Sequence, residues 1–528
     1  MDKNILSEAI YKIIKSKPLN EKEFFNTARK EFGKLKLSTP EKSQLLSAYH
    51  NLVKNGKIKT NKNIERILTK RAVRTLSGVA VISVLTKPYP CTGKCLYCPT
   101  EKNMPKSYLS NEPAVMRAIL AKFDPFKQIK IRLNALKANG HQTDKIELIV
   151  MGGTWSCHSK QYQIWFIKRC LDALNGKVSK NIVQAHKQNQ TAKHRCIGLT
   201  LETRPDYINK EEIIRMRKLG ATRIELGIQH IDDKILKLNR RGHNNATSIK
   251  AINLLKQAGF KLNFHMMLNL PGSTPAKDLS MFKKLYSSSD YMPDMVKIYP
   301  CVVNEHADLF KLWKKGKYKS YSDKQLRKLI IQIKKITPPF VRITRLIRDI
   351  PEESIISGNK ITNLRQLIAN EAKGHWSCKC IRCREAGHLK LISNFQFSNF
   401  KFKKLKYHAN GGTEYFLSFE SPDEKVLYAF LRLRVDNKPE KNFIPELRDS
   451  AIIRELHTYG KMTGIGESGN DVQHMGFGKK LLAEAEKFTK KNGLKKISVI
   501  SGIGVRKYYE KQGYKLQGEY MIKKFIIK

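Results

Sequence analysis

Hydrophobic positions recur at helical spacing through the first 70 residues. Apolar side chains repeat every three or four positions over residues 5–14 and again over 24–32, and Pro18 and Pro40 fall between such stretches. The intervening positions are mostly polar. The pattern therefore predicts a helical segment over residues 1–70.

From about residue 71 the pattern changes to short β-rich runs that alternate with amphipathic stretches. Two of these stretches, 211–219 and 246–258, are followed by Gly220 and Gly259, which is how many helices end. Repeated strand–helix units build a parallel α/β architecture whose active site lies at the carboxyl ends of the strands. We therefore expect an incomplete (β/α)6 barrel over residues 71–350. Its predicted strands are 79–85, 146–151, 197–201, 223–228, 262–268 and 296–299.

After about residue 390 the pattern is that of a different domain. Alternating strand patterns over 413–420, 426–434 and 450–456 lead into a helix that ends near residue 491 and a further strand over 496–501. This order predicts an α+β domain over 391–528. Residues 351–390 are then a linker between the two domains.

The net charge of the chain indicates what kind of partner it binds. The chain has 100 Lys and Arg against 46 Asp and Glu, a net charge of +54. Such an excess repels itself unless a polyanion shares it, so a nucleic acid is the first partner to expect. Residues 1–70 alone hold 16 basic against 7 acidic residues, and we expect this segment to contact RNA. The alternative is a solvated bundle that only packs on a neighbour.

The sequence gives no sign of a membrane partner. No basic leader followed by an apolar run opens it, and no apolar run approaches the roughly 18 residues of a membrane span. We therefore expect a soluble, cytoplasmic protein, in which the ten cysteines are ligands or free thiols rather than disulfides.

Three cysteines follow the first predicted strand at Cys-x3-Cys-x2-Cys spacing, as Cys91, Cys95 and Cys98. A four-iron cluster usually takes four cysteine ligands, so a three-cysteine loop leaves one iron open for a non-protein ligand. That open position is the defining feature of radical S-adenosylmethionine (SAM) enzymes. The alternatives are half of a zinc site or a chance grouping.

Polar or glycine-rich groups follow the later strands of the predicted barrel. Paired glycines allow backbone to approach a cofactor closely, and carboxylate, guanidinium, amide and imidazole groups can bind its polar parts. Any one of them could be an ordinary loop residue, but their recurrence at successive strand ends favours a SAM site. They are Gly152, Gly153, Thr154, Glu202, Arg204, Glu225, Gln229 and His265.

A second cysteine group, Cys378, Cys380 and Cys383, predicts a zinc site in the linker. A closed structural zinc site takes four nitrogen or sulfur ligands, so one more is needed. We expect Cys301 to supply it, with His375 as the alternative. Free thiols on a turn are the remaining interpretation. Cys157, Cys170 and Cys196 have no partner spacing.

A glycine-rich loop opens the predicted helix of the last domain. Gln473, Gly476 and Gly478 form a Gln-x-x-Gly-x-Gly pattern between a strand and that helix. The N-H groups and positive dipole end of a helix suit a pyrophosphate. The order of elements resembles the GNAT acetyltransferases, which bind acetyl-coenzyme A by such a loop.

Several longer motifs together resemble the catalytic subunit of Elongator, in its stand-alone bacterial or archaeal form without obligatory protein subunits. The resemblance covers the chain from about residue 71 to its end, across two unrelated domains in the right order. The motifs that carry it are residues 73–80, the three-cysteine loop, 149–154, 201–206, 223–229, 454–457 and 473–478.

The resemblance implies a tRNA carboxymethyluridine synthase, a radical SAM acyltransferase that acts on the wobble uridine of the anticodon stem-loop. A 5′-deoxyadenosyl radical, formed with an external electron donor, would take hydrogen from the methyl group of acetyl-coenzyme A. The resulting carbon radical would add to carbon 5 of uracil, and hydrolysis of the thioester would then release coenzyme A and leave the carboxymethyl group. The resemblance also implies catalytic roles for Glu455 and Tyr509. It implies acetyl-coenzyme A contacts for Lys145, Glu455, Leu456, His457, Thr458, Phe477, Gly478, Lys479 and Tyr509.

Two other classes are weighed against this one. A protein lysine acetyltransferase would need only the last domain, with Glu455 as base. A non-catalytic tRNA-binding module would explain the charge alone. Neither gives the cysteine loop and the strand-end groups a task.

Overall fold

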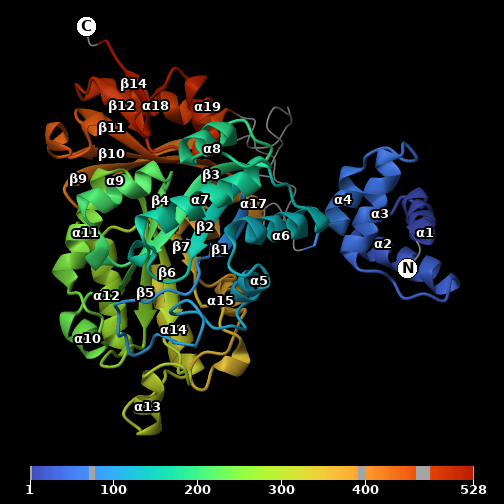
Figure 1. Cartoon of the computed structure of the whole chain (residues 1–528), viewed down its shortest axis with the longest axis horizontal. Helices are drawn as coiled ribbons and strands as arrows, with labels where there is room; N and C mark the ends of the chain where they lie inside the picture. The colour runs from blue at the N-terminus through green and yellow to red at the C-terminus, as the bar shows by residue number, and fades with distance from the viewer. Residues whose placement is uncertain (1–2, 71–77, 390–399, 460–475, 527–528) are drawn as a thin grey trace.

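The computed structural model describes residues 3–70, 78–389, 400–459 and 476–526 in three connected parts (Figure 1). They are a lobe of helices at the N-terminus, a curved parallel sheet covered by helices, and a second, mixed sheet. Gln473 and residues 73–77 of the predicted motifs lie outside the described residues.

The N-terminal lobe has a hydrophobic core of its own. Side chains at helical spacing, among them Ile10, Phe24 and Tyr49, are fully buried inside it. The lobe meets the rest of the chain beside α6, where Lys70 N donates to Asn139 O at 3.2 Å. Helices are thus found where the sequence predicted them. They are α1 (Lys3–Lys15), α2 (Glu21–Lys34), α3 (Lys42–Lys54) and α4 (Lys62–Leu68).

The first sheet is an incomplete parallel α/β barrel, as predicted. Its described strands number seven and run in chain order from β1 to β7, each parallel to the next. The prediction of six strands missed β7, because its sequence Arg-Ile-Thr-Arg is short and mostly polar. The strands are β1 (Ala80–Leu85), β2 (Lys145–Met151), β3 (Arg195–Thr203), β4 (Arg223–Gln229), β5 (Lys261–Leu268), β6 (Met295–Pro300) and β7 (Arg342–Arg345).

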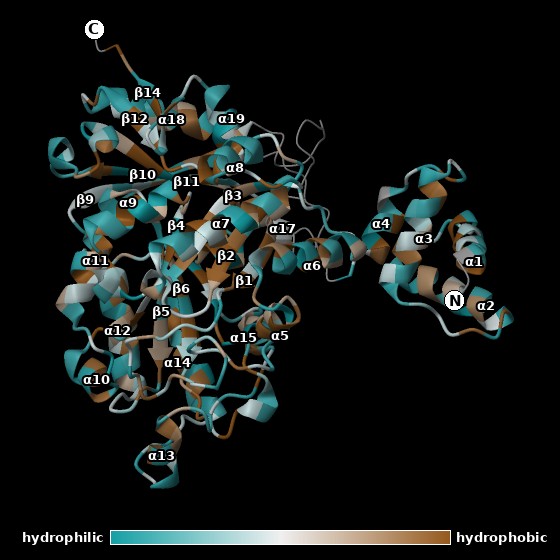
Figure 2. Ribbon diagram, viewed as in Figure 1, coloured by the Kyte–Doolittle hydropathy of each residue, from teal (hydrophilic) through white to brown (hydrophobic). Residues whose placement is uncertain are grey.

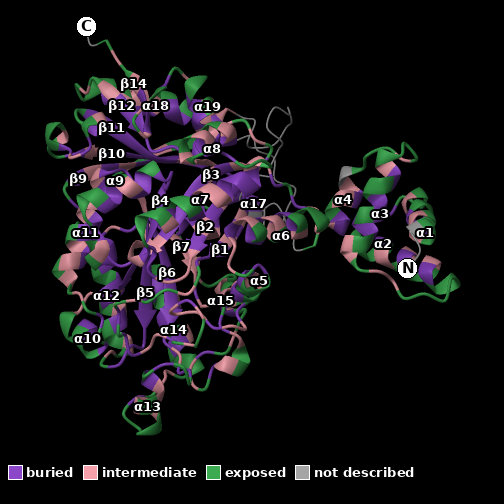
Figure 3. Ribbon diagram, viewed as in Figure 1, coloured by how far each residue is buried: buried purple, intermediate pink, exposed green. Residues whose placement is uncertain are grey.

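Helices cover the outer face of the barrel. Many begin at a side chain that accepts a hydrogen bond from the first turn, as Asp124 does for α6 and Ser159 for α7. Figure 2 shows the barrel strands as largely hydrophobic and the helices as a mixture of hydrophobic and hydrophilic residues, and Figure 3 shows the strands as the most buried part. They include α5 (Pro113–Leu120), α6 (Pro125–Ala138), α7 (Lys160–Asn175), α8 (Ile182–Asn189), α9 (Lys210–Lys218), α10 (Asp233–Leu238), α11 (Asn245–Gln257), α12 (Pro275–Ser287), α14 (Asp323–Lys335) and α15 (Leu364–Ala372). The short helix α13 (Leu309–Lys314) instead extends from the end of the barrel away from the second sheet.

The second sheet has the order β13-β14-β12-β11-β10-β9-β8 and is antiparallel except between β11 and β12. The short helices α16 (Ile381–Arg384) and α17 (Ala386–Leu389) precede it. Its helices are α18 (Phe477–Lys491) and α19 (Arg506–Glu510). Its strands are β8 (Lys401–Ala409), β9 (Gly412–Glu420), β10 (Leu427–Asp436), β11 (Ser450–Thr458), β12 (Lys496–Val499), β13 (Lys515–Gln517) and β14 (Tyr520–Lys524).

The second sheet packs against the amino ends of the barrel strands. Arg454 on β11 donates to Phe260 O, just before β5, at 2.6 Å and pairs with Asp294, just before β6. A Cβ on Gly502 would lie 2.0 Å from Ile197 O on β3, so this contact requires glycine. The two sheets share one hydrophobic core. The carboxyl ends of the barrel strands therefore point away from the second sheet.

Candidate active site

The cysteine loop lies between β1 and α5, at the carboxyl end of the barrel. Cys91 Sγ accepts a hydrogen bond from Gly93 N at 3.4 Å, and Cys95 Sγ accepts one from Arg241 Nη1 at 3.4 Å. Hydrogen bonding with the Cys157 thiol lowers the pKa of Cys91 to about 5, while burial raises the pKa of Cys98 to about 11. The spacing analysis missed Cys157, whose proximity to Cys91 comes from the turn after β2.

Arg204 places a second cation beside this loop. Its Nε and Nη2 bind Asp206 at 2.9 and 2.8 Å, and Nη2 also donates to Arg241 O at 2.9 Å. Its Nη1 is buried and has no hydrogen-bond partner among the described residues. A Cβ on Gly93 would lie 2.2 Å from that nitrogen. Three thiols with an unpaired donor and two buried cations around them fit an anionic iron–sulfur cluster.

The paired glycines after β2 lie next to the same loop. Gly152 and Gly153 have φ of 128° and 91°, and a Cβ on Gly152 would lie 2.1 Å from Thr86 Oγ1. The following Thr154 Oγ1 lies 3.6 Å from Cys91 Sγ. The two glycines thus let the strand end turn in a left-handed conformation close to Thr86 and Lys106, which brings Thr154 beside the cysteine loop.

Inside the barrel, three predicted residues from three strands meet. His265 Nε2 lies 3.0 Å from Glu225 Oε2, and its Nδ1 lies 3.7 Å from Glu202 Oε1. Lys297 Nζ also binds Glu225. Tyr108 OH donates to Glu202 Oε2 at 2.8 Å. The sequence analysis missed Lys297 and Tyr108, although a lysine inside the apolar strand β6 was a visible signal.

The charges of this inner cluster are fixed by its burial and its partners. Burial acts to raise the pKa of Glu225, but the Lys297 ammonium and the His265 hydrogen bond hold that pKa well below its ordinary value. Burial acts to lower the pKa of Lys297, but the Glu225 carboxylate raises that pKa above its ordinary value. The cluster therefore presents an ionised carboxylate and a protonated amine to the barrel interior.

Gln229 ends β4 and Asn269 follows β5, both in the left-handed backbone region, with φ of 71° and 61°. Asn269 Oδ1 accepts from Tyr321 N at 2.6 Å, and Asn269 N donates to Asp278 Oδ2 at 2.8 Å. Asn269 thus fixes the turn after β5. Gln229 is half-buried at the end of β4 and keeps its predicted position at the carboxyl end of the barrel.

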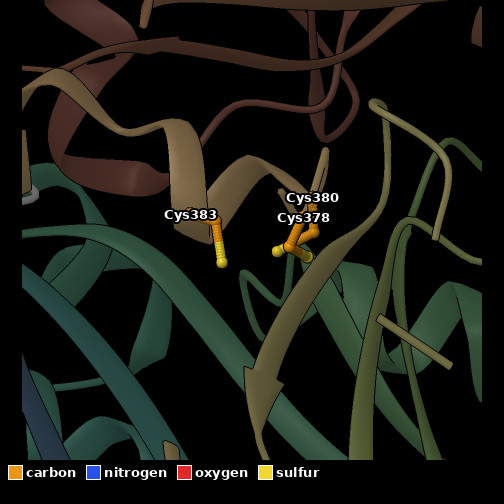
Figure 4. A group of neighbouring side chains, drawn as sticks. All are labelled: Cys378, Cys380 and Cys383. Atoms are coloured by element: carbon orange, nitrogen blue, oxygen red, sulfur yellow. The ribbon is translucent and has the colours of Figure 1, made fainter. Parts of the chain in front are cut away.

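The second cysteine group lies at the opposite end of the barrel. The sulfurs of Cys378, Cys380 and Cys383 lie within 4.8 Å of one another and gather toward one point (Figure 4). Lys334 Nζ donates to Cys383 Sγ at 3.4 Å. Hydrogen bonds from the neighbouring thiols, and the charge of Lys334, lower the pKa of Cys383. The geometry fits a single metal ion.

Cys301 does not belong to this group, contrary to the prediction. The cysteine group lies beside the start of β7, where Ile381 N donates to Val341 O at 3.0 Å, whereas Cys301 follows the carboxyl end of β6. A six-residue strand spans about 20 Å, which separates the two. Cys301 is buried against Tyr318 instead. The alternative ligand, His375, is exposed and is not part of the close group.

The residues expected to hold acetyl-coenzyme A gather at the start of α18. Gly476 has φ of 69°, and a Cβ on Gly478 would lie 3.2 Å from Tyr508 OH and 3.8 Å from Thr458 Oγ1. Phe477 is buried among aromatic rings, and Lys479 is exposed. The end of β11 and the start of α18 therefore lie side by side, with the His457 and Tyr459 rings tilted against each other, their centroids 4.3 Å apart, and Leu456 half-buried.

Two residues expected to be catalytic are buried in closed environments. Glu455 accepts from Arg432 Nε at 2.9 Å and lies 3.6 Å from Lys261 Nζ. Although burial opposes it, these cations lower the pKa of Glu455 to about 2. Tyr509 packs in the core on Tyr514, whereas its neighbour Tyr508 carries its hydroxyl to the start of α18. The resemblance named Tyr509 alone for the site, and the structure places the Tyr508 hydroxyl beside Gly478.

Lys145 begins β2 at the end of the barrel that faces the second sheet. Arg195, which lies opposite Lys145 on the adjacent strand β3, packs against Gly504. Burial lowers the pKa of Lys145. The lysine thus lies at the junction of the two sheets.

Comparison with known families identifies the class first. Residues 89–285 match the Radical SAM superfamily, and residues 293–373 match the Radical_SAM C-terminal domain. Together with the cysteine loop at the head of a partial barrel, these matches define a radical SAM enzyme. This class uses a [4Fe-4S] cluster and S-adenosylmethionine. No helix in the described part of the chain is long and apolar enough to cross a membrane.

Relatives with known names narrow the assignment. The chain is 47% identical over 469 residues to the tRNA uridine(34) acetyltransferase of Methanocaldococcus infernus, covering 86% of this chain and 87% of that protein. It is 39% identical to Elongator complex protein 3 of Homo sapiens, covering 86% of each. The solved structure of the archaeal Methanocaldococcus infernus Elp3 with N-terminus deletion (1-46) matches with a TM-score of 0.75 at 44% identity, over 85% of this chain and all of that one. The chain belongs to the family of tRNA uridine(34) acetyltransferases and Elongator complex protein 3.

Proposed function

We propose that this protein carboxymethylates the wobble uridine of tRNA, with acetyl-coenzyme A as carbon source, to give 5-carboxymethyluridine. The observation that carries the proposal is the pairing in one chain of a cysteine loop suited to a cluster with a glycine-opened helix suited to a pyrophosphate. A long, near-complete similarity to tRNA uridine(34) acetyltransferases supports it.

Cys91, Cys95 and Cys98 hold the [4Fe-4S] cluster in this proposal. The bound cluster, given an electron from an external donor, supplies the reductive cleavage of S-adenosylmethionine to a 5′-deoxyadenosyl radical. Arg204 Nη1 and the Arg241 guanidinium balance the negative charge at the thiolates. Gly152, Gly153 and Thr154 admit the amino-acid end of the cofactor.

The polar cluster inside the barrel orients the other parts of the reactants. Glu202, Glu225 and His265 accept or donate hydrogen bonds from fixed positions, because Lys297 and Tyr108 hold them. Gln229 adds an amide at the end of β4. Since burial keeps bulk water away, these groups protect a reactive radical as well as position it.

Acetyl-coenzyme A binds at the start of α18 in this proposal. The N-H groups of the first turn, which have no carbonyl partner within the helix, and the helix dipole favour its pyrophosphate, and Thr458 and Tyr508 lie beside Gly478 in that turn. Lys145 is a cation at the sheet junction that can face the phosphates. Glu455 orients β11 through its pair with Arg432 rather than acting as a base.

The tRNA is held by the positive surface. With a net charge of +54, the chain attracts the phosphate backbone, and the basic lobe α1–α4 enlarges the surface that RNA can contact. A uridine that reacts inside the barrel has to leave its stack, which is least costly in an unpaired loop.

Cys378, Cys380 and Cys383 are proposed to bind zinc as a structural ion between the barrel and the second sheet. Zinc in such sites takes four ligands, and a protonated Lys334 offsets part of the charge of three thiolates. His375, on the segment leading to Cys378, remains the candidate for the fourth ligand.

The proposal is tested by an anaerobic reaction of the cluster-loaded protein with tRNA, S-adenosylmethionine, acetyl-coenzyme A and a reductant. Mass spectrometry of digested nucleosides should reveal 5-carboxymethyluridine, and omission of S-adenosylmethionine should abolish it. Acetylation of protein lysines without S-adenosylmethionine, and unmodified tRNA, would instead make the second domain a lysine acetyltransferase.

A further inference from the structure

A small helical projection at the open end of the barrel has no task in the mechanism above. It consists of α13 and the turn after it, residues 309–319, which we call the α13 projection. In Figure 1 it extends from the barrel on the side away from the second sheet, and in Figure 3 most of it is exposed.

The α13 projection is joined directly to the cysteine loop. Leu309 N donates to Leu96 O at 2.8 Å, and Thr100 N donates to His306 O at 2.8 Å. Tyr97, between two of the cysteines, packs in the same hydrophobic cluster as Leu309. The projection is therefore held at a fixed position beside the site where the radical forms.

Two aromatic rings lie on the projection. Phe310 and Trp313 are stacked, with centroids 5.9 Å apart and planes 15° apart, and both are half-buried. Lys314 Nζ lies 4.6 Å from the centre of the Phe310 ring. Because a lysine already covers Phe310, Trp313 is the ring that we assign to a ligand.

Exposed lysines surround these rings. Lys311 pairs with Asp308 at 3.2 Å. The ion pairs found between described residues include none for the other four, Lys314, Lys315, Lys317 and Lys319, all of which are exposed. Four unpaired cations within six residues create a local positive potential that favours a polyanion.

We propose that the α13 projection binds the single-stranded loop of the RNA substrate, with Trp313 stacked on an unpaired base next to the one that reacts. Aromatic rings interleaved with cations are the usual surface for unpaired nucleotides, since the rings stack on bases and the cations bind phosphates. Stacking on the neighbouring base compensates part of the cost of extruding the reacting base. This inference rests on the proposed function.

The test uses the full-length protein and a short RNA hairpin with the anticodon loop, carrying 2-aminopurine next to the target uridine. Stacking on Trp313 quenches 2-aminopurine fluorescence. We expect Trp313→Ser to abolish the quenching and weaken binding about tenfold, and Trp313→Phe to retain most of both. Trp165→Ser is the matched control, because Trp165 is 43% exposed on the outer helix α7, and it should change neither.

The lysines are tested in matched sets. Replacing Lys314, Lys315, Lys317 and Lys319 by serine should reduce the salt dependence of binding, whereas serine at Lys487, Lys491, Lys495 and Lys511, equally exposed on the second domain, should leave it nearly unchanged. If the two sets of substitutions changed the salt dependence of binding equally, the lysines of the α13 projection would contribute only to the overall charge. That result would overturn the proposal.

A cross-linking arm needs no variant and guards against misfolding. A 4-thiouridine beside the target uridine should cross-link to a peptide that contains residues 309–319; cross-links elsewhere only would overturn the inference. If the wild-type protein modifies the tRNA while Trp313→Ser retains full quenching, only this inference fails. If the wild-type protein neither binds nor modifies the RNA, the proposed function fails.

Discussion

The two ends of the barrel surround their buried arginines with different groups. At the amino end, Arg454 binds Asp294 at 3.0 Å and Glu414 at 2.9 Å, and Arg434 also binds Glu414 at 3.2 Å. At the carboxyl end, Arg204 keeps one buried nitrogen without a partner among the described residues. The carboxylates at the amino end hold two sheets together, whereas at the carboxyl end Arg204 and Arg241 lie beside the thiols of the cysteine loop.

The two cysteine groups repeat this contrast. Their spacings are similar, yet one lies on a loop with two arginines at the open end, and the other has three sulfurs within 4.8 Å beside a lysine at the closed end. In an iron–sulfur cluster each thiolate binds a different iron. The three sulfurs must therefore lie farther apart than they do around a single metal ion. Backbone and neighbours, rather than the cysteine pattern, distinguish the two.

The largest effect is expected at the open end. Cys95→Ala removes one thiolate of the cluster loop, so iron content and S-adenosylmethionine cleavage should fall to background while zinc content stays unchanged. Iron and zinc counted per chain and 5′-deoxyadenosine by chromatography check this. Cys170→Ala, at a buried thiol of the barrel core, is the control. Loss of zinc with retained iron would reverse our assignment of the two groups.

A second test removes a charge from the closed end. Asp294→Asn leaves the buried arginines Arg432 and Arg454 short of a counter-charge, which costs about 3–5 kcal/mol of folding free energy. Its matched control at the open end is Asp308→Asn. This substitution removes an exposed ion pair with Lys311, which contributes less than about 1 kcal/mol to the folding free energy. Urea unfolding measures both. Similar losses for the two variants would remove the distinction between closed and open ends.

The Glu455 pair predicts a pH dependence of stability. The pKa of Glu455 is lowered to about 2 in the folded protein, so its contribution is complete above the unfolded value near 4.5 and disappears as pH falls toward 2. Glu455→Gln should therefore cost about 3 kcal/mol at pH 7 and progressively less below pH 4.5. Unfolding free energies of both proteins between pH 7 and pH 3 test this, and a constant difference would contradict it.

The smallest effect concerns the cation beside the zinc group. Lys334→Met removes the ammonium 3.4 Å from Cys383 Sγ, and zinc affinity should fall roughly 10–100-fold. Competition with a chromophoric chelator measures the affinity, and Lys328→Met, an exposed lysine on the same helix, is the control. An unchanged affinity would mean that Lys334 does not balance the thiolates.

The sequence predicted the architecture and most of the strand-end residues because apolar strands and the residues that end them are local patterns. It missed Cys157, whose approach to Cys91 depends on the turn after β2. It assigned Cys301 to zinc because the sequence does not reveal which end of the barrel the segment around Cys378 packs against. Consecutive residues of a helix point about 100° apart, so Tyr508 rather than Tyr509 carries a hydroxyl to the start of α18.

The central claim is that both ends of the barrel contribute to one reaction, although the length of a six-residue strand, about 20 Å, separates them. The most direct measurement uses acetyl-coenzyme A with a trideuterated methyl group and tRNA under anaerobic conditions. The account predicts one deuterium in 5′-deoxyadenosine and two in the carboxymethyl group of the nucleoside. Modified tRNA accompanied by 5′-deoxyadenosine free of deuterium would contradict it.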